Sequence, residues 1–140
     1  MSRPATLRRD QVAVGDALPG LDVPITATAI VSGAIASRDY QDVHHDRDRA
    51  VAQGSKDIFM NILTTNGYVG RYVSDWAGPE ALIRCVDIRL GIPNYPGDTM
   101  RFSGEVTAVE GDVVTVAVRG SNDLGDHVTG TVHLSLPEPA

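Results

Sequence analysis

Aromatic residues and cysteine are scarce in this sequence, and it contains no long uninterrupted apolar run. Aromatic side chains make up 5% of the 140 residues, so a core must rest mainly on Val, Ile, Leu and Ala. The single cysteine, Cys85, excludes an internal disulfide, and no Cys-x-x-Cys or Cys/His metal pattern occurs. Cys85 lies in the apolar run ALIRCVDIRLGI, where we expect a small strand residue rather than a nucleophile.

Signals for export and for membrane insertion are missing as well. No charged-then-apolar signal peptide opens the chain. The longest apolar-leaning run, VPITATAIVSGAIAS, is interrupted by Thr, Ser and Gly and is too short to span a bilayer. We therefore expect a cytoplasmic protein with no membrane partner.

Basic residues are outnumbered by acidic ones, which gives a formal net charge of −6. Phosphate contacts need a basic face, so the charge argues against a nucleic-acid partner. The length fits one domain, and an apolar content of 42% is sufficient for a core. We expect a single domain over residues 1–140, with an irregular lead-in over residues 1–20 where Pro and Gly are frequent. A domain of this size buries a modest share of its surface, which favours a dimer.

The first half of the chain predicts a strand followed by two helices. Residues 24–36 have strand composition. Asp46 can cap a short helix that Gly54 ends in a left-handed conformation. A longer helix is expected over residues 57–77, where apolar positions recur at close to 3.6 residues. We expect Gly67 and Gly70 to allow this helix to approach a sheet closely.

The second half of the chain predicts strands only. They are expected over residues 81–92, 99–109, 113–121 and 127–136, and the first is apolar enough to be buried. Short turns link most of them, so the sheet is expected to be antiparallel. The predicted fold class is therefore α+β, with an antiparallel sheet that can wrap around one long helix.

Ionisable side chains crowd residues 38–48, just before the helices. They include Arg38, Asp39, Asp42, His44, His45, Asp46 and Asp48. One interpretation is a solvated loop in which an aspartate caps a helix. A second is a metal site, which the residues disfavour because adjacent histidines diverge and no HExxH pattern occurs. A third is a metal-free acid/base pair around a water molecule, and spacing alone does not raise it above the first.

The stretch RDYQDVHHD resembles the signature of the MaoC-like (R)-specific enoyl-CoA hydratases, roughly G-D-x-N-P-[LIV]-H-x-[DE]. The matching positions are Asp39, Val43, His44 and Asp46. The resemblance covers about residues 24–136 and implies the hot-dog fold, in which an antiparallel sheet wraps around one long central helix. It also implies an enzyme that adds water to a trans-2-enoyl-CoA, with Asp39 and His44 as its catalytic pair. No cofactor is implied, since CoA is part of the substrate.

The sequence departs from that signature at three places. The family's Gly before the Asp is Arg38 here, its Asn-Pro is Gln41-Asp42, and its His-Gly at the start of the long helix falls near Asn61-Ile62. In the family a backbone N–H at that helix start receives the thioester oxygen, so the resemblance leaves this role between Asn61 and Ile62. Further substrate-binding candidates are Tyr40 and Gly54, with Lys56 and Arg101 as possible phosphate contacts.

Three stretches point to a narrower group within the family. The segments RDYQDVHHDRD, AVAQGSKDIF and YVSDWAGP resemble the small subunits of heteromeric hydratases that act on steroid side chains in actinobacteria. This resemblance implies a larger MaoC-like subunit as partner, in a heterodimer or heterotetramer. It further implies a cholesterol or steroid side-chain CoA ester as substrate.

Two other functions compete with hydration. A hot-dog acyl-CoA thioesterase would need a carboxylate on the long helix, and residues 58–74 contain no Asp or Glu. A non-catalytic subunit that binds lipid or acyl-CoA is favoured by the departures from the signature and disfavoured by the retained Asp39 and His44. We expect His127 and His133 to be ordinary surface or interface residues on the polar face of a strand.

Overall fold

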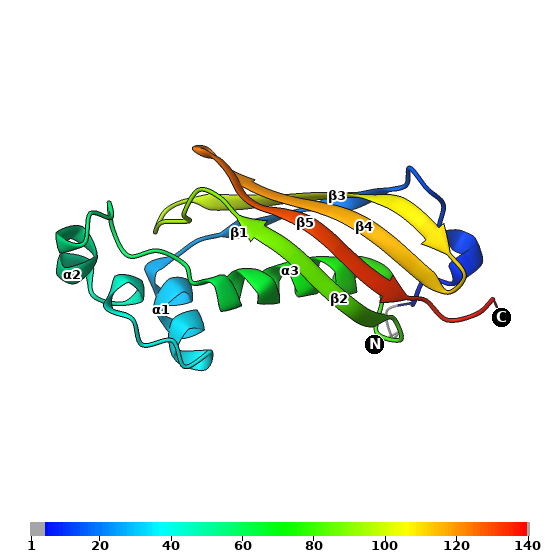
Figure 1. Ribbon diagram of the computed structural model, residues 1–140, viewed down its shortest axis with the longest axis horizontal. Coiled ribbons are helices and arrows are strands. Elements are labelled where there is room, and N and C mark those ends of the chain that lie inside the picture. The colour runs from blue at the N-terminus through cyan, green and yellow to red at the C-terminus, as the bar shows by residue number, and fades with distance from the viewer. Residues whose placement is uncertain (1–4, 140) are drawn as a thin grey trace.

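A curved antiparallel sheet lies over one long helix, and two shorter helices stand at one end of the molecule (Figure 1). The computed structural model describes residues 5–139. Its elements are, in chain order, η1 (Arg9–Gln11), β1 (Ala17–Pro24), α1 (Ala27–Ala36), η2 (Asp42–His44), α2 (Arg47–Ala52), α3 (Ile62–Ala77), β2 (Leu82–Leu90), β3 (Thr99–Glu110), β4 (Val113–Asn122) and β5 (Gly125–Ser135). Within this part of the chain, no helix is both long enough and apolar enough to cross a membrane.

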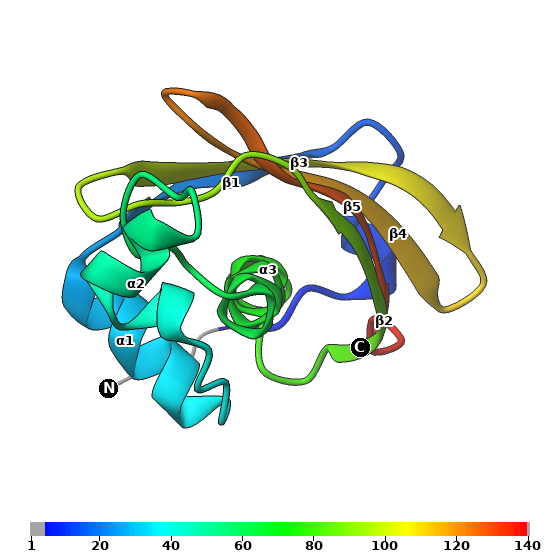
Figure 2. The same cartoon turned by 60° about the vertical axis from the view of Figure 1, so that its left-hand side comes forward.

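The five strands form one sheet in the order β1-β3-β4-β5-β2, with every neighbouring pair antiparallel. A tight turn at Gly111 (φ 62°) joins β3 to β4, and Gly125 (φ 138°) follows the turn into β5. Figure 2 shows the sheet curving over α3, with α1 and α2 beside the start of that helix. The predicted α+β class and the four strands after the helix are confirmed.

The core lies between α3 and the concave face of the sheet. Thr65, Val69, Tyr72 and Val73 of α3 are buried at spacings of three and four residues, as one face of a helix requires. Burial of a side chain such as Val69 contributes about 1.5–3 kcal/mol. Tyr72 stacks on Phe102 at a centroid distance of 5.1 Å, a rare aromatic contact in a core that consists mainly of aliphatic residues.

Residues 24–36 were predicted as a strand, and that prediction is wrong. The strand β1 ends at Pro24, and α1 begins after Thr26, whose side-chain oxygen accepts a hydrogen bond from the N–H of Ala29. Only Ile30 and Ala34 of α1 are buried. The N-cap and the burial of two residues four positions apart therefore outweigh the weak strand preference of the β-branched residues. The irregular lead-in is also shorter than predicted, because β1 begins at Ala17; residues 1–4 of that prediction lie outside the described residues.

The long helix begins at Ile62, five residues later than predicted. Residues 57–61 are not helical, and two of their backbone N–H groups donate to other segments. The N–H of Phe59 donates to the carbonyl of Val43, and the N–H of Met60 donates to the carbonyl of Asn94. These two hydrogen bonds hold the segment before α3 between residues 43 and 94. Apolar periodicity cannot predict them, because they depend on contacts with distant parts of the chain. The short helix α2, its Asp46 cap and the left-handed Gly54 (φ 90°) are confirmed.

Two packing predictions are wrong. The apolar strand β2 is not buried, because it lies at the edge of the sheet, and Leu82 and Cys85 are exposed. Gly67 does not allow a close approach, since a Cβ there would meet nothing within 4 Å. The close approach is at Gly33 of α1, where a Cβ would collide with the side chain of Thr64.

Candidate active site

The end of α1 determines where Asp39 points. The N–H of Arg38 donates to the carbonyl of Ile35 (3.0 Å), and the N–H of Asp39 donates to the carbonyl of Ala34 (2.9 Å). These two bonds form a Schellman motif, whose C′ residue must adopt a left-handed conformation. Arg38 has φ 57° and is the one non-glycine residue of the described chain with positive φ. The motif turns the chain sharply, so that Asp39 follows directly on the helix end.

His44 comes from η2 and is buried, with 6% of its surface exposed. Its Nδ1 lies 2.7 Å from the carbonyl oxygen of Phe59. Because a carbonyl only accepts, Nδ1 carries the proton of the neutral ring, and Nε2 presents a lone pair. The ring of Phe59 packs edge-on against the imidazole at 5.0 Å. The orientation and the tautomer of His44 are therefore both set by the segment before α3.

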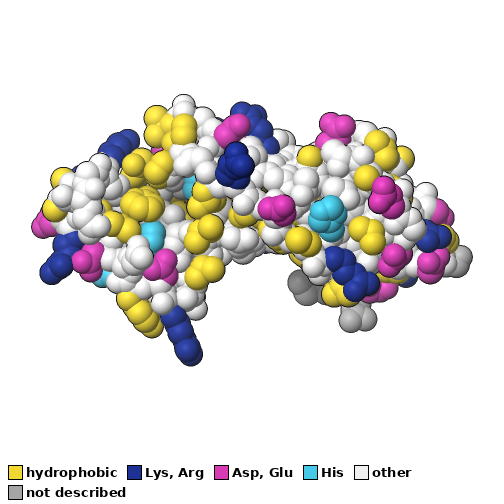
Figure 3. Space-filling view, viewed as in Figure 1, with side chains coloured by type: hydrophobic (Ala, Val, Ile, Leu, Met, Phe, Trp, Pro, Cys, Tyr) yellow, Lys and Arg dark blue, Asp and Glu magenta, His cyan; other side chains and the backbone are white. Residues whose placement is uncertain are grey.

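Asp39 and His44 face each other, as the resemblance implied. Oδ2 of Asp39 lies 3.3 Å from Nε2 of His44. When Nδ1 of His44 carries the ring proton, Nε2 and the carboxylate oxygen are both acceptors, and a water molecule can bind beside them by donating one of its two O–H groups to each. Figure 3 shows hydrophobic side chains around a histidine at the end of the molecule that α1 and α2 form.

Asn61 links this pair to α3. It is almost completely buried, and its Nδ2 donates to Oδ2 of Asp39 (3.1 Å) and to Oγ of Ser37 (2.9 Å). Its Oδ1 accepts from the N–H of Thr64 and so caps the helix. The hydrogen bond from Asn61 is the main cause that holds the pKa of Asp39 below its usual value, with smaller contributions from the N–H of Gln41 and from His44. Asp39 is therefore ionised near neutral pH.

The start of α3 lies beside the same carboxylate. Asn61 is the N-cap, so Ile62 and Leu63 are the first helical residues, and their N–H groups have no partner within the helix. Among the described residues, 5–139, the N–H of Ile62 has no hydrogen-bond acceptor. The side chain of Asn61 is fully occupied by contrast. Of the two candidates for binding a thioester oxygen, the geometry favours the backbone of Ile62.

Most of the other predicted substrate-binding residues lie away from Asp39 and His44. Tyr40 follows Asp39 directly, and its side chain is 66% exposed. Gly54 lies at the end of α2 with open space around it. Lys56 lies over the ring of Tyr95, and Arg101 on β3 pairs with Asp123 at 2.8 Å. None of these last three contacts Asp39 or His44 through a hydrogen bond or an ion pair.

His127 is not the surface residue that alternation along β5 predicted, because it is 2% exposed. The ladder between β4 and β5 passes from Val128 to Asp126 and skips His127, so a bulge turns this side chain inward. Its Nδ1 lies 2.6 Å from the carbonyl of Ile92, and its Nε2 lies 2.9 Å from the hydroxyl of Thr65. Burial lowers the pKa of His127. This neutral histidine ties the first turn of α3 to the sheet. His133, by contrast, is half-buried, and its Nδ1 lies 3.0 Å from the hydroxyl of Thr115.

Comparison with known proteins gives close and distant relatives. No protein-family model matches the chain. It is 63% identical over 123 residues to the 3-oxo-4,17-pregnadiene-20-carboxyl-CoA hydratase beta subunit of Mycobacterium tuberculosis, which covers 88% of this chain and 95% of the relative. The structure matches a chain in the crystal structure of the ChsH1–ChsH2 complex from Mycobacterium tuberculosis with a TM-score of 0.87 and 63% identity, over 89% of this chain and 98% of that chain.

A more distant structure has the same fold. The unliganded R-hydratase PhaJ1 from Pseudomonas aeruginosa matches with a TM-score of 0.87 over 96% of this chain and 88% of that chain. At 20% identity, this likeness concerns the fold alone. It agrees with the hot-dog architecture, in which a sheet wraps around a central helix.

Proposed function

Because the chain belongs to the MaoC-like (R)-specific enoyl-CoA hydratase family, we propose that Asp39 and His44 are the acid/base pair that adds water to the double bond of an enoyl-CoA. The activity is that of a hydro-lyase. One observation carries the assignment of these residues: a carboxylate oxygen and an imidazole nitrogen lie 3.3 Å apart, each with its orientation set by neighbours.

Water is held by both acceptors of the pair. As its oxygen bonds to the β-carbon, one O–H bond breaks and the pair takes the proton. The pair then delivers a proton to the α-carbon, so that the reaction consumes one water and no net proton. General acid/base catalysis of this kind contributes roughly 10²–10⁴-fold. Both groups belong to this chain, and CoA enters only as part of the substrate.

The thioester oxygen gains negative charge during the addition. We propose that it accepts a hydrogen bond from the N–H of Ile62, where the dipole of α3 also stabilises an anion. The position follows from the Asn61 network, since the residue that caps α3 also binds Asp39. Asp39 and the proposed oxyanion donor are therefore both positioned by the side chain of Asn61.

We further propose that a larger MaoC-like subunit completes the enzyme, in a heterodimer or heterotetramer. The relative is a beta subunit, and the matching crystal structure is of a complex of two named components. In this chain, β2 pairs with β5 on one side only, and Leu82 on it is 54% exposed. An apolar edge strand with free backbone groups is suited to pair with another chain.

By the same relationship, the proposed substrate is the CoA ester of a shortened steroid side chain. The relative is named for 3-oxo-4,17-pregnadiene-20-carboxyl-CoA, a steroid CoA ester with two double bonds and a keto oxygen. A substrate that carries CoA is consistent with a cytoplasmic enzyme.

A product assay tests this function. The chain, purified with its partner subunit, is incubated with the steroid enoyl-CoA, and the products are separated by mass. Hydration predicts a product heavier by one water with its thioester intact. Release of free CoA thiol would instead identify a thioesterase, and an unchanged substrate would identify a non-catalytic subunit.

A further inference from the structure

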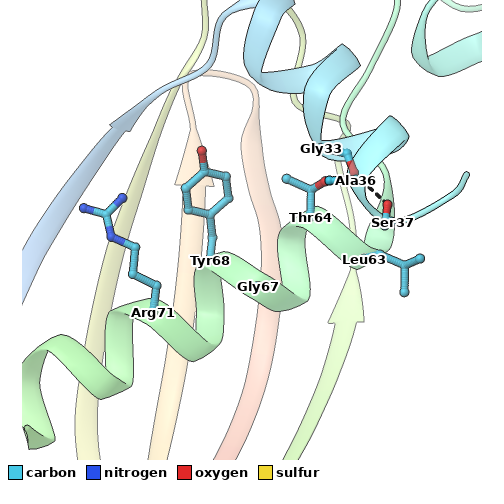
Figure 4. A pocket seen from close by; sticks show the side chains of 8 residues that line it. All are labelled: Gly33, Ala36, Ser37, Leu63, Thr64, Gly67, Tyr68 and Arg71. Carbon is cyan, nitrogen blue, oxygen red and sulfur yellow. Dashed lines mark hydrogen bonds between the residues drawn. The ribbon is translucent and has the colours of Figure 1, made fainter. Parts of the chain in front are cut away.

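A groove lies between α1 and the outer side of α3 (Figure 4). Its volume is about 380 Å³, within the range of small-molecule sites. Its lining is mostly small or apolar and consists of Gly33, Ala36, Ser37, Leu63, Thr64, Gly67, Tyr68 and Arg71. In Figure 4, Tyr68 and Arg71 rise from α3 on the same side as Thr64, and Arg71 stands at the end remote from α1.

One end of the groove is linked to Asp39 through Asn61. Ser37, which lines it, accepts a hydrogen bond from Asn61, and the same Asn61 nitrogen donates to Asp39. The first residues of α3, where the thioester oxygen is proposed to bind, lie at the same end. A substrate whose reacting carbons lie at Asp39 can therefore extend along α3 toward Arg71.

We propose that this groove holds the fused rings of the steroid acyl group, with the keto oxygen at the far end of the rings bound by Arg71. The inference rests on the proposed function and adds the location and orientation of the rings. Thr64 and Arg71 are seven residues apart, which corresponds to about 10 Å along a helix. A nucleus of four fused rings has a similar length, so one end can react while the other meets the guanidinium.

Gly67 supports this assignment because packing does not require it. A glycine inside a helix lowers the stability of that helix by about 1 kcal/mol relative to alanine. At Gly33 packing requires the glycine, since any Cβ would collide with the side chain of Thr64. At Gly67 a Cβ would meet nothing within 4 Å, and the space above it belongs to the groove. A missing side chain at this point leaves room for a flat ring system.

Arg71 is the one charged residue in the lining of the groove. Its Nε lies 3.3 Å from Oδ2 of Asp75, one turn later on α3. A guanidinium has five N–H donors, so this ion pair holds the side chain and leaves donors for a further acceptor. A neutral keto oxygen accepts such a hydrogen bond without a change in the net charge of the groove.

The test uses the assembled complex and two substrates, the 3-oxo steroid enoyl-CoA and the short but-2-enoyl-CoA. Gly67→Leu fills the groove and is expected to lower kcat/KM for the steroid by about tenfold or more, the range over which steric fit discriminates substrates. For the short substrate we expect a change within about twofold, because the reacting groups are untouched. Retained activity on the short substrate also establishes that the variant is folded.

A second variant tests the orientation without filling the groove. Arg71→Met is expected to lower kcat/KM about tenfold for the 3-oxo steroid, the effect of one hydrogen bond to a charged donor, and to leave a steroid analogue without the 3-oxygen unaffected. Arg119→Met is the matched control, since Arg119 is an exposed arginine paired with Asp126 on β4, outside the groove.

Equal losses on both substrates for Gly67→Leu, or equal losses with and without the 3-oxygen for Arg71→Met, would overturn the inference. The same result would arise if a segment of the partner subunit filled the groove. The parent complex would still hydrate the short substrate in that case, and the proposed function would be unaffected. Failure of the proposed function would instead appear as no hydration of either substrate by the parent complex.

Discussion

At the scale of single residues, Asn61 connects the start of α3 to the carboxylate of Asp39. The sequence motif identified Asp39 and His44, which lie 3.3 Å apart, and their catalytic role stays a prediction. It assigned Asn61 only as a possible oxyanion donor. The positioning role of Asn61 could not be predicted, because it depends on three hydrogen bonds to segments before and after it in the chain.

The same limit applies to His127. Strand alternation predicts an outward side chain, and one bulge reverses it. A bulge depends on the pairing of two strands, so the sequence of β5 alone does not contain it.

Asn61→Ser tests how Asp39 is held ionised. Serine keeps an oxygen that can cap α3 but removes the amide that donates to Asp39. The pKa of Asp39 then rises toward its usual value, so the acidic limb of the pH profile of kcat/KM is expected to move to higher pH. The stability that the ionised carboxylate contributes is present above its unfolded-state pKa and is lost as the pH falls through its folded-state pKa, so this loss should also begin at higher pH.

The matched control is Asn66→Ser, which removes an asparagine that donates to the carbonyl of Ile62 on the exposed side of α3. It should leave the acidic limb in place. An acidic limb that is identical in Asn61→Ser and the parent enzyme would contradict the role assigned to this amide.

At the scale of elements, the end of α1 explains a departure from the family signature. Arg38 occupies the C′ position of a Schellman motif, for which glycine is the favoured residue. The backbone of this chain therefore favours glycine at the position that Arg38 occupies, because the left-handed conformation suits a residue without a Cβ. The Schellman motif could not be predicted from the sequence, because residues 24–36 were expected to form a strand and no helix end was expected there.

Arg38→Gly is therefore expected to stabilise the chain. A non-glycine residue in the left-handed region costs roughly 1–2 kcal/mol, and the greater freedom of glycine in the unfolded chain offsets about half of that. The net gain should be about 0.5–1 kcal/mol in the free energy of unfolding by urea. Arg38→Ala retains the Cβ and should give no gain. Equal stabilisation by both substitutions would show that the arginine charge matters rather than the backbone.

At the scale of the whole molecule, the chain leaves an edge strand and one side of α3 open. The presence of four strands after the long helix, and a sheet that can wrap around that helix, were predictable from turns and periodicity. The exposure of β2 was not, because an apolar run has the same pattern in a central strand and in an edge strand that pairs with a partner. The chain length indicated only that a domain of this size buries a modest share of its surface, which favours assembly with another chain.

Leu82→Lys tests the role of the β2 edge. A charge on an edge strand opposes pairing with another chain, so the variant should fold but should not assemble with the larger subunit. Light scattering after size-exclusion chromatography measures the assembly. Leu124→Lys is the matched control, since Leu124 is 55% exposed in the turn between β4 and β5. Assembly of both variants to the same extent would exclude β2 as the interface.

The central claim is that Asp39 and His44 perform the hydration together. The most direct measurement is kcat for an enoyl-CoA with Asp39→Asn and His44→Gln, each assembled with the partner, beside His45→Gln as a control at an exposed neighbouring histidine. Each of the first two variants should fold and lose about 10²–10⁴-fold in kcat, and the control should retain parent activity. A rate near that of the parent enzyme in either Asp39→Asn or His44→Gln would contradict the account.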